Sequence, residues 1–202
     1  MRNLFHKSGI IVFLILSQIL FSQPTTAPDA PTASVQDVVS IYSDAYTDVP
    51  AVWNPNWGTN TTVVEEVVIA NNNVKKYTLF NFSGLDFGAA VGGGTIDASV
   101  RTHIRLNYWT DDATSIKIKL VDYGADDAWG NDNISAISTS NVLTTDLGTW
   151  KSIDVDLNEM AVGGLTTRAN IGQMVLEATV AEGATAPTVY FDNIYFFGAP
   201  PT

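Results

Sequence analysis

The 202-residue chain carries 21 acidic and 10 basic side chains, a formal net charge of −11, and no cysteine. Such a negative surface repels nucleic acid and anionic membranes, so neither is an expected partner. Disulfide bonds are excluded, so stability must come from a packed core, for which this length allows a single domain.

The first 22 residues are predicted to be a secretory signal peptide. Arg2 and Lys7 precede an apolar run from Ile10 to Phe21, and the small residue Ser22 follows it. A transmembrane anchor is the alternative, but the run is shorter than the roughly 20 apolar residues that span a bilayer. We therefore expect an extracellular or periplasmic protein without membrane insertion. Without Arg2 and Lys7, 8 basic and 21 acidic side chains remain, a formal charge of −13, and His103 is the one histidine.

Pro-rich stretches flank the rest of the chain. Residues 23–36 (QPTTAPDAPTASVQ) are rich in Pro, Thr and Ala, which predicts an extended, disordered linker. Residues 198–202 (GAPPT) are either a tail or the start of a second linker. Linkers at both ends are typical of a module joined to something larger, and a short natural tail is the alternative. The module itself is predicted over residues 37–197.

Short runs of Val, Ile, Tyr, Phe and Thr, separated by Gly, Asn and Asp, predict strands throughout residues 37–197. About eight strands without a helical period predict an all-β fold, a β-sandwich jelly roll. The predicted strands are Val38–Tyr42, Val63–Ala70, Val74–Phe82, His103–Thr110, Ile116–Tyr123, Trp150–Leu157, Gln173–Ala178 and Thr188–Phe196.

Alternation along the strand His103–Thr110 separates an apolar face from an unusual outward face. A solvated face normally carries Thr, Ser, Lys or Glu. Here the outward row is His103, Arg105, Asn107 and Trp109. An aromatic ring can stack on a pyranose while neighbouring polar groups bond its hydroxyls, so this row is a candidate sugar-binding site.

Four further tryptophans are alternative candidates for contact with a ligand or for packing in the core. Trp53 and Trp57 lie in a loop with Pro55, where a large aromatic either covers the edge of the core or contacts a ligand. Trp129 lies in a very polar loop, which favours ligand contact. Trp150 begins a strand, which favours packing in or beside the core.

The acidic residues suggest two further hypotheses. Asp154, Asp156 and Glu159 resemble the spacing of the catalytic strand of family 16 glycoside hydrolases, but the first position is Asp, and an ordinary solvated strand face explains all three. Asp44 and Asp48 follow the first strand and Asp192 lies in the last, and these strands can be neighbours in a jelly roll. Hard carboxylate oxygens gathered there would suit Ca²⁺, and the alternative is that they only shape turns and a bulge.

Five stretches together resemble one family. They are Val39–Tyr46, Trp53–Trp57, Thr102–Thr110, Leu120–Ala125 and Val189–Tyr195. They look like the accessory β-sandwich modules of secreted Bacteroidetes polysaccharide-degrading proteins, which are often joined to family 16 laminarinases. The resemblance spans about residues 37–197.

This resemblance implies a galactose-binding-domain-like jelly roll with a structural calcium at Asp192 and, less directly, Asp44. It also implies glycan binding on a concave sheet face or in the loops at one end. We therefore expect a non-catalytic carbohydrate-binding module that stacks a neutral polysaccharide, a β-glucan or algal glycan, and that can be linked to a catalytic or surface domain. A structural or adhesive spacer without glycan affinity and a glycoside hydrolase fragment are the alternatives.

Overall fold

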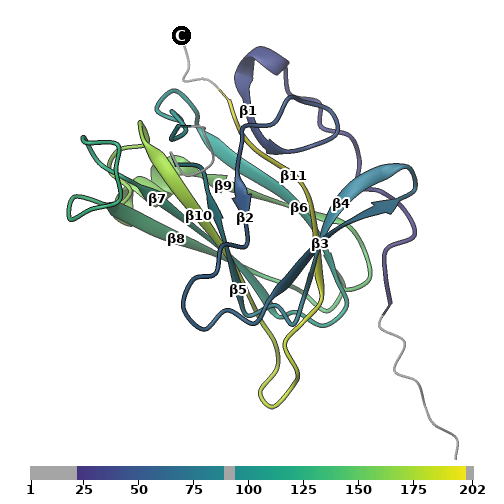
Figure 1. The fold of residues 1–202 in the computed structure, drawn as a ribbon. Helices are drawn as coiled ribbons and strands as arrows, with labels where there is room; N and C mark the ends of the chain where they lie inside the picture. The colour runs from purple at the N-terminus through teal and green to yellow at the C-terminus, as the bar shows by residue number, and fades with distance from the viewer. Residues whose placement is uncertain (1–21, 89–93, 199–202) are drawn as a thin grey trace, which may run out of the picture.

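The computed structural model of the chain describes residues 22–88 and 94–198 (Figure 1). Residues 1–21, most of the predicted signal peptide, lie outside the described part, as do residues 199–202. No helix within the described ranges is long and apolar enough to cross a bilayer.

The described residues form eleven strands and two short helices. The strands are β1 (Val38–Tyr42), β2 (Val52–Trp53), β3 (Val63–Ile69), β4 (Asn72–Thr78), β5 (Phe82–Asp86), β6 (His103–Thr110), β7 (Ser115–Asp122), β8 (Ile134–Asn141), β9 (Lys151–Asp156), β10 (Ile171–Thr179) and β11 (Val189–Phe197). The helices are the 3-10 helix η1 (Val35–Asp37) and the α-helix α1 (Leu157–Val162).

The strands form two antiparallel sheets that lie face to face (Figure 1). Sheet A has the order β3-β4-β11-β6-β9, and β1 pairs with the second half of β11. Sheet B has the order β2-β5-β10-β7-β8. This arrangement confirms the predicted all-β, jelly-roll sandwich.

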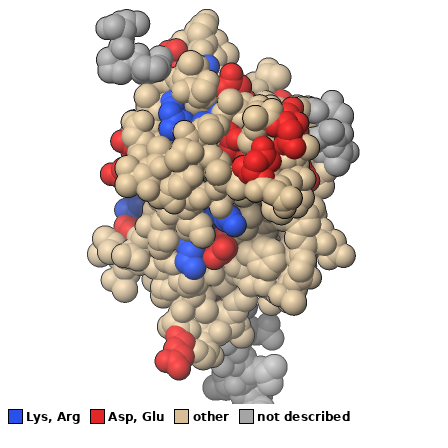
Figure 2. Space-filling model, turned by 90° about the vertical axis from the view of Figure 1, so that its left-hand side faces the viewer, with Lys and Arg blue, Asp and Glu red and all other residues tan. Residues whose placement is uncertain are grey.

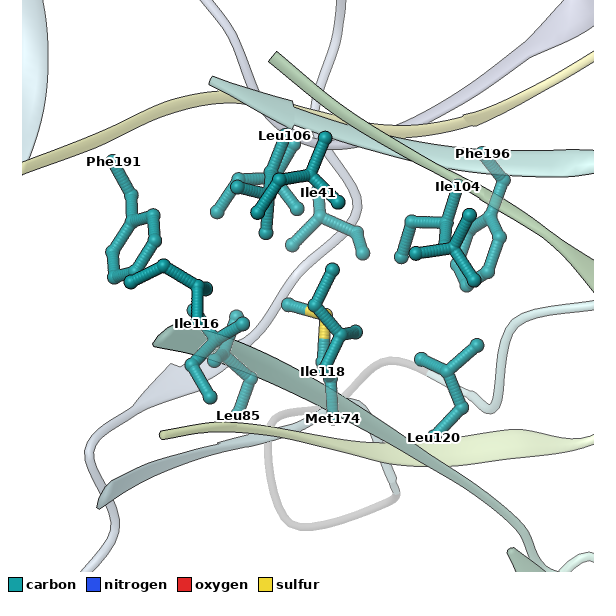
Figure 3. Close-up of a cluster of buried hydrophobic side chains, with 14 of the residues drawn as sticks. Ile41, Leu85, Ile104, Leu106, Ile116, Ile118, Leu120, Met174, Phe191 and Phe196 are labelled. Atoms are coloured by element: carbon teal, nitrogen blue, oxygen red, sulfur yellow. The ribbon is translucent and has the colours of Figure 1, made fainter. Parts of the chain in front are cut away.

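The core lies between the two sheets, where alternate side chains of each strand meet (Figure 3). Ile104 and Leu106 of β6 face Ile118 and Leu120 of β7, and all four are almost completely buried. Burial of one such aliphatic side chain stabilises a fold by about 1.5–3 kcal/mol. The apolar face predicted for the strand His103–Thr110 is therefore confirmed.

Three strands were not predicted, β2, β5 and β8. The predicted strand Val74–Phe82 continues too far, because β4 ends at Thr78, Leu79 adopts a positive φ of 50°, and the chain turns there before β5 begins at Phe82. β8 is rich in Ser and alternates less clearly, with its exposed Ile137 on the outer face. The helix α1 was also missed: it begins where the side chain of Asp156 accepts a hydrogen bond from the amide of Asn158 (2.7 Å).

A second, smaller apolar cluster lies on the outer face of sheet A. It consists of Ile69, Val74, Trp109 and Tyr190, with Val67 and Trp150 packed against it. Residues 22–36, which we call the N-terminal segment, run along this face (purple in Figure 1). Four side chains of the rest of the protein donate hydrogen bonds to its carbonyl oxygens: Trp150 Nε1 to Thr26 (2.5 Å), Asn193 Nδ2 to Asp29 (3.3 Å), Tyr46 Oη to Ala33 (2.8 Å) and an Arg101 nitrogen to Gln36 (3.3 Å). The stretch predicted as a disordered linker thus packs on the sheet.

Candidate functional site

The outward row of β6 is engaged with other parts of the protein. Arg105 binds Asp154 through two nitrogens at 2.6 and 2.5 Å, which also raises the pKa of the guanidinium. Asn107 donates to Ser152 Oγ at 2.7 Å, and the ring of His103 stacks on Phe197 with centroids 5.3 Å apart. The polar groups of this row are thus held by their neighbours.

Trp109, the aromatic member of that row, is 3% exposed. Its ring meets Tyr190 edge to face, with centroids 5.6 Å apart, within the cluster that the N-terminal segment covers. Alternation correctly predicted that Trp109 points away from the main core, but the ring lies in a second core and offers no open stacking face.

Trp53 also packs within the protein. It lies against the main core and meets Tyr42 edge to face, with centroids 5.5 Å apart, and Lys75 Nζ lies 4.8 Å from its ring centre. Of the two roles considered for this tryptophan, the structure shows the one that covers the edge of the core.

Trp57 lies on the outer face of sheet B, over the backbone of Gly84 in β5. A Cβ at Gly84 would lie only 2.1 Å from Cζ3 of Trp57, so the indole rests directly on the strand. The loop that carries it is fixed by Asn54, which has a positive φ of 53° and whose amide donates to the carbonyl of Thr62 at 2.9 Å. One face of the indole is thus supported by backbone, which suits the opposite face for stacking.

Tyr123 lies on the same face, over Gly172, but its side chain is only 5% exposed, so it has no open stacking face. A Cβ at Gly172 would lie 2.3 Å from Cε2 of Tyr123. Trp129 stands nearly perpendicular to this tyrosine, with an interplanar angle of 80° and centroids 5.9 Å apart, and it is 66% exposed. Trp129 thus rises above the sheet as a wall beside Tyr123.

Two polar side chains lie between these aromatic groups. Asp86 and Gln173 are directly paired across β5 and β10, and with Trp57, Tyr123 and Trp129 they line a hollow of about 550 Å³. The amide of Gly88 donates to Asp86 Oδ1 at 2.9 Å, which orients this carboxylate. Burial and the neighbouring charge of Asp86 raise the pKa of Tyr123 to about 12.

The spacing of the two glycines sets the length of the hollow. Gly84 pairs with Val175, three residues along β10 from Gly172, which corresponds to about 10 Å at 3.3 Å per residue. Trp57 and the exposed Trp129, with a carboxylate and a carboxamide beside them and the buried Tyr123 as the floor of the hollow, can contact successive sugar rings of one chain and bond their hydroxyls.

The surroundings of the hollow are acidic. The loop that carries Trp129 also carries Asp126, Asp127 and Asp132. Figure 2 views the molecule from the side of β7, β8 and β10, and shows acidic side chains gathered in one region, apart from the Lys and Arg side chains of that side. An anionic ligand would be repelled here.

The acids with hydrolase-like spacing have structural partners. Asp154 is bound by Arg105, Asp156 caps α1 and Glu159 lies within that helix. They therefore do not form two carboxylates facing one hollow, which is the arrangement that glycoside hydrolysis requires.

The three acids predicted to bind calcium lie around the meeting point of β1, β4 and β11. Asp192 accepts hydrogen bonds from Asn72 (2.6 Å) and from the amide of Asn193 (2.6 Å). Burial, and then the charges of Asp44 and Asp48, raise the pKa of Asp192 to about 6. Among the described residues, no three His, Cys, Asp or Glu side chains are arranged to hold a metal ion. The negative charge of these three acids favours a cation, whereas the carboxylate of Asp192 as placed is bound by two hydrogen-bond donors.

Similarity to solved structures is clear although sequence similarity is low. The chain superposes on the family 30 carbohydrate-binding module of a cellulosomal cellulase of Clostridium thermocellum with a TM-score of 0.54 and 14% identity, over 80% of this chain and 97% of the module. A second family 30 module gives 0.53 and 14% identity over 82% and 89%. The fold is that of carbohydrate-binding modules. The module CBM28, described as specific for non-crystalline cellulose, gives 0.50 and 14% identity over 84% and 97%.

Larger proteins contain the same fold as one part. An exo-β-agarase matches with a TM-score of 0.51 and 13% identity over 81% of this chain, but over only 25% of its own length. Neither a protein-family model nor a curated protein sequence matches the chain. At these identities the similarity establishes the fold alone.

Three residues of the hollow were missed in the sequence: Tyr123, Asp86 and Gln173. Tyr123 directly follows β7, at the start of a polar loop. Asp86 and Gln173 are far apart in the sequence and become neighbours only through the register of β5 and β10. The available signal was the glycines, because a glycine inside a strand often marks a close approach of another group. Gly84 and Gly172 both have this role here.

Proposed function

We propose that the protein is a non-catalytic carbohydrate-binding module that holds a neutral polysaccharide, a β-glucan or an algal glycan, on the outer face of sheet B. The observation that carries the proposal is the indole of Trp57, seated on the strand backbone at Gly84 and lining one hollow with the exposed Trp129. A ring backed by strand backbone keeps its orientation without a ligand, so little conformational entropy is lost on binding.

The polar groups support the same ligand class. Asp86, Gln173 and the hydroxyl of Tyr123 supply acceptors and donors for hydroxyl groups. The acidic loop around Trp129 and the overall negative charge disfavour uronate and sulfate groups. The sequence suggested binding either on a sheet face or in the loops at one end. The proposed site uses both, because Trp57 lies on the face of sheet B and Trp129 comes from a loop.

Affinity gel electrophoresis of residues 23–202 tests this function. We expect slower migration in gels that contain one of the neutral glycans, laminarin, mixed-linkage glucan, xylan or agarose, and unchanged migration in alginate. Bovine serum albumin in the same gels is the control for sieving. Unchanged migration in every gel would contradict glycan binding and favour the spacer hypothesis.

We also propose that the protein acts outside the cytoplasm and, as a weakly binding module, is joined to or acts beside a catalytic or surface domain. Weak single sites become effective when they are linked, because the second contact is then intramolecular. The hydrophobic leader and the occurrence of this fold as a quarter of an exo-β-agarase support this setting.

Calcium at Asp192, with Asp44 and Asp48 nearby, is a separate proposal. An ion would neutralise the buried carboxylate and hold the junction of β1 and β11 together. Millimolar calcium is expected to raise the melting temperature over that in chelator by about 5–10 °C at a hundredfold excess over Kd. This shift should vanish in Asp192→Asn and persist in Asp126→Asn.

An identical melting temperature with calcium and with chelator would contradict the calcium proposal. In that case Asp192→Asn should melt above the unmodified protein at neutral pH, because the substitution removes an uncompensated buried charge.

A further inference from the structure

The start of the N-terminal segment lies against Asp111, a carboxylate with one unpaired oxygen among the described residues. The amide of Ser22 donates to Asp111 Oδ2 at 3.1 Å. The other oxygen, Oδ1, is buried and accepts no hydrogen bond from any described residue. Within residues 22–88 and 94–198, no Lys or Arg side chain forms an ion pair with Asp111. A buried, unpaired acceptor destabilises the folded state, and a charged one does so more strongly.

A positively charged group with several donors would suit this carboxylate better than one backbone amide. An α-ammonium group has three N–H donors and a full positive charge, so it can serve both oxygens of Asp111. The chain supplies such a group at this place if the signal peptide is removed after Ser22. Hydrolysis of the Ser22–Gln23 bond consumes one water and leaves a carboxylate on the leader and an ammonium on Gln23.

We propose that Asp111 is the binding site for the amino-terminal ammonium group created by signal-peptide removal. The new terminus begins one residue after the amide that now contacts Asp111. A hollow of about 430 Å³ lies beside this part of the segment, lined by residues 22–29 together with Trp109, Gly148, Thr149 and Trp150.

An ammonium group bound at Asp111 would affect the outer face of sheet A. The first contact of the N-terminal segment after Asp111 is the bond from Trp150 Nε1 to Thr26, and beneath it lie Trp109 and Tyr190. An ion pair at the very start of the segment fastens it over this aromatic cluster. Leader removal thus completes the fold of this face.

The test compares residues 23–202 carrying a free α-amine with the same chain acetylated at its amino terminus. Gln23→Ser is present in both, because an amino-terminal glutamine can cyclise and lose its amine. We expect the free amine to raise the melting temperature by about 2–4 °C, as for an ion pair near 1 kcal/mol in a chain of this size. The difference should shrink in 1 M salt.

Asp111→Asn should abolish the difference, and Glu182→Gln, in an exposed loop between β10 and β11, should leave it unchanged. An extension of Gly-Ser before residue 23 keeps the charge but moves it, and should melt like the acetylated chain, a comparison that does not depend on the stability of Asp111→Asn. Equal melting of the free and acetylated chains, or a difference that survives Asp111→Asn, would overturn the proposal.

Discussion

Trp57→Ala is expected to weaken glycan binding at least about 30-fold, the effect of losing an aromatic residue that contributes 2 kcal/mol or more at a binding site. The indole lies on the strand backbone at Gly84 and is partly exposed, outside the main core, so the fold should be retained. Isothermal titration with oligosaccharides of the bound glycan measures the loss. Trp150→Phe, on the opposite sheet, is the matched control.

Gly84→Ala tests the same surface without touching the indole. The new methyl group would lie 2.1 Å from Cζ3 of Trp57, so the ring must leave the strand. We expect a loss of affinity close to that of Trp57→Ala. Gly94→Ala, where a Cβ meets nothing within 4 Å, should bind normally. Normal binding by both Trp57→Ala and Gly84→Ala would show that the glycan is held elsewhere.

Trp109→Ala is expected to destabilise the protein by about 3–5 kcal/mol, because it empties the centre of the cluster on sheet A. For a chain of this size that lowers the melting temperature by about 10 °C or more. Trp129→Ala, which removes a side chain that is 66% exposed, is the control and should melt almost normally. Differential scanning calorimetry measures both.

The folded fraction of Trp109→Ala should still bind glycan as the unmodified protein does, whereas Trp129→Ala should bind more weakly. The opposite pattern, a stable Trp109→Ala that no longer binds, would return the site to the outer face of sheet A.

The fold was largely predictable because strand alternation reports burial directly. β1 and β6 have the predicted bounds, and the inward faces of β6 and β7 are as expected. The errors in strand bounds arise where the backbone conformation of a single residue interrupts the alternation of apolar and polar side chains. Leu79 adopts a left-handed conformation that its residue type does not indicate, so the predicted strand continued past the end of β4 at Thr78.

The site was only partly predictable, because it depends on which segment covers which face. The row ending at Trp109 points outward as predicted, but the pattern does not report that residues 22–36 pack over it. Trp57 and Trp129 were named, and the structure brings them to one hollow with Tyr123. Asp86 and Gln173 meet through strand register, which depends on turns that sequence alone does not specify.

The indole N–H resonances of the five tryptophans offer the most direct test of where the glycan binds. Each tryptophan is assigned by single substitution, and the protein is titrated with oligosaccharides of the glycan that retards it. We expect the resonances of Trp57 and Trp129 to shift while those of Trp53, Trp109 and Trp150 stay in place. Shifts of Trp109 and Trp150 with Trp57 unmoved would contradict this expectation.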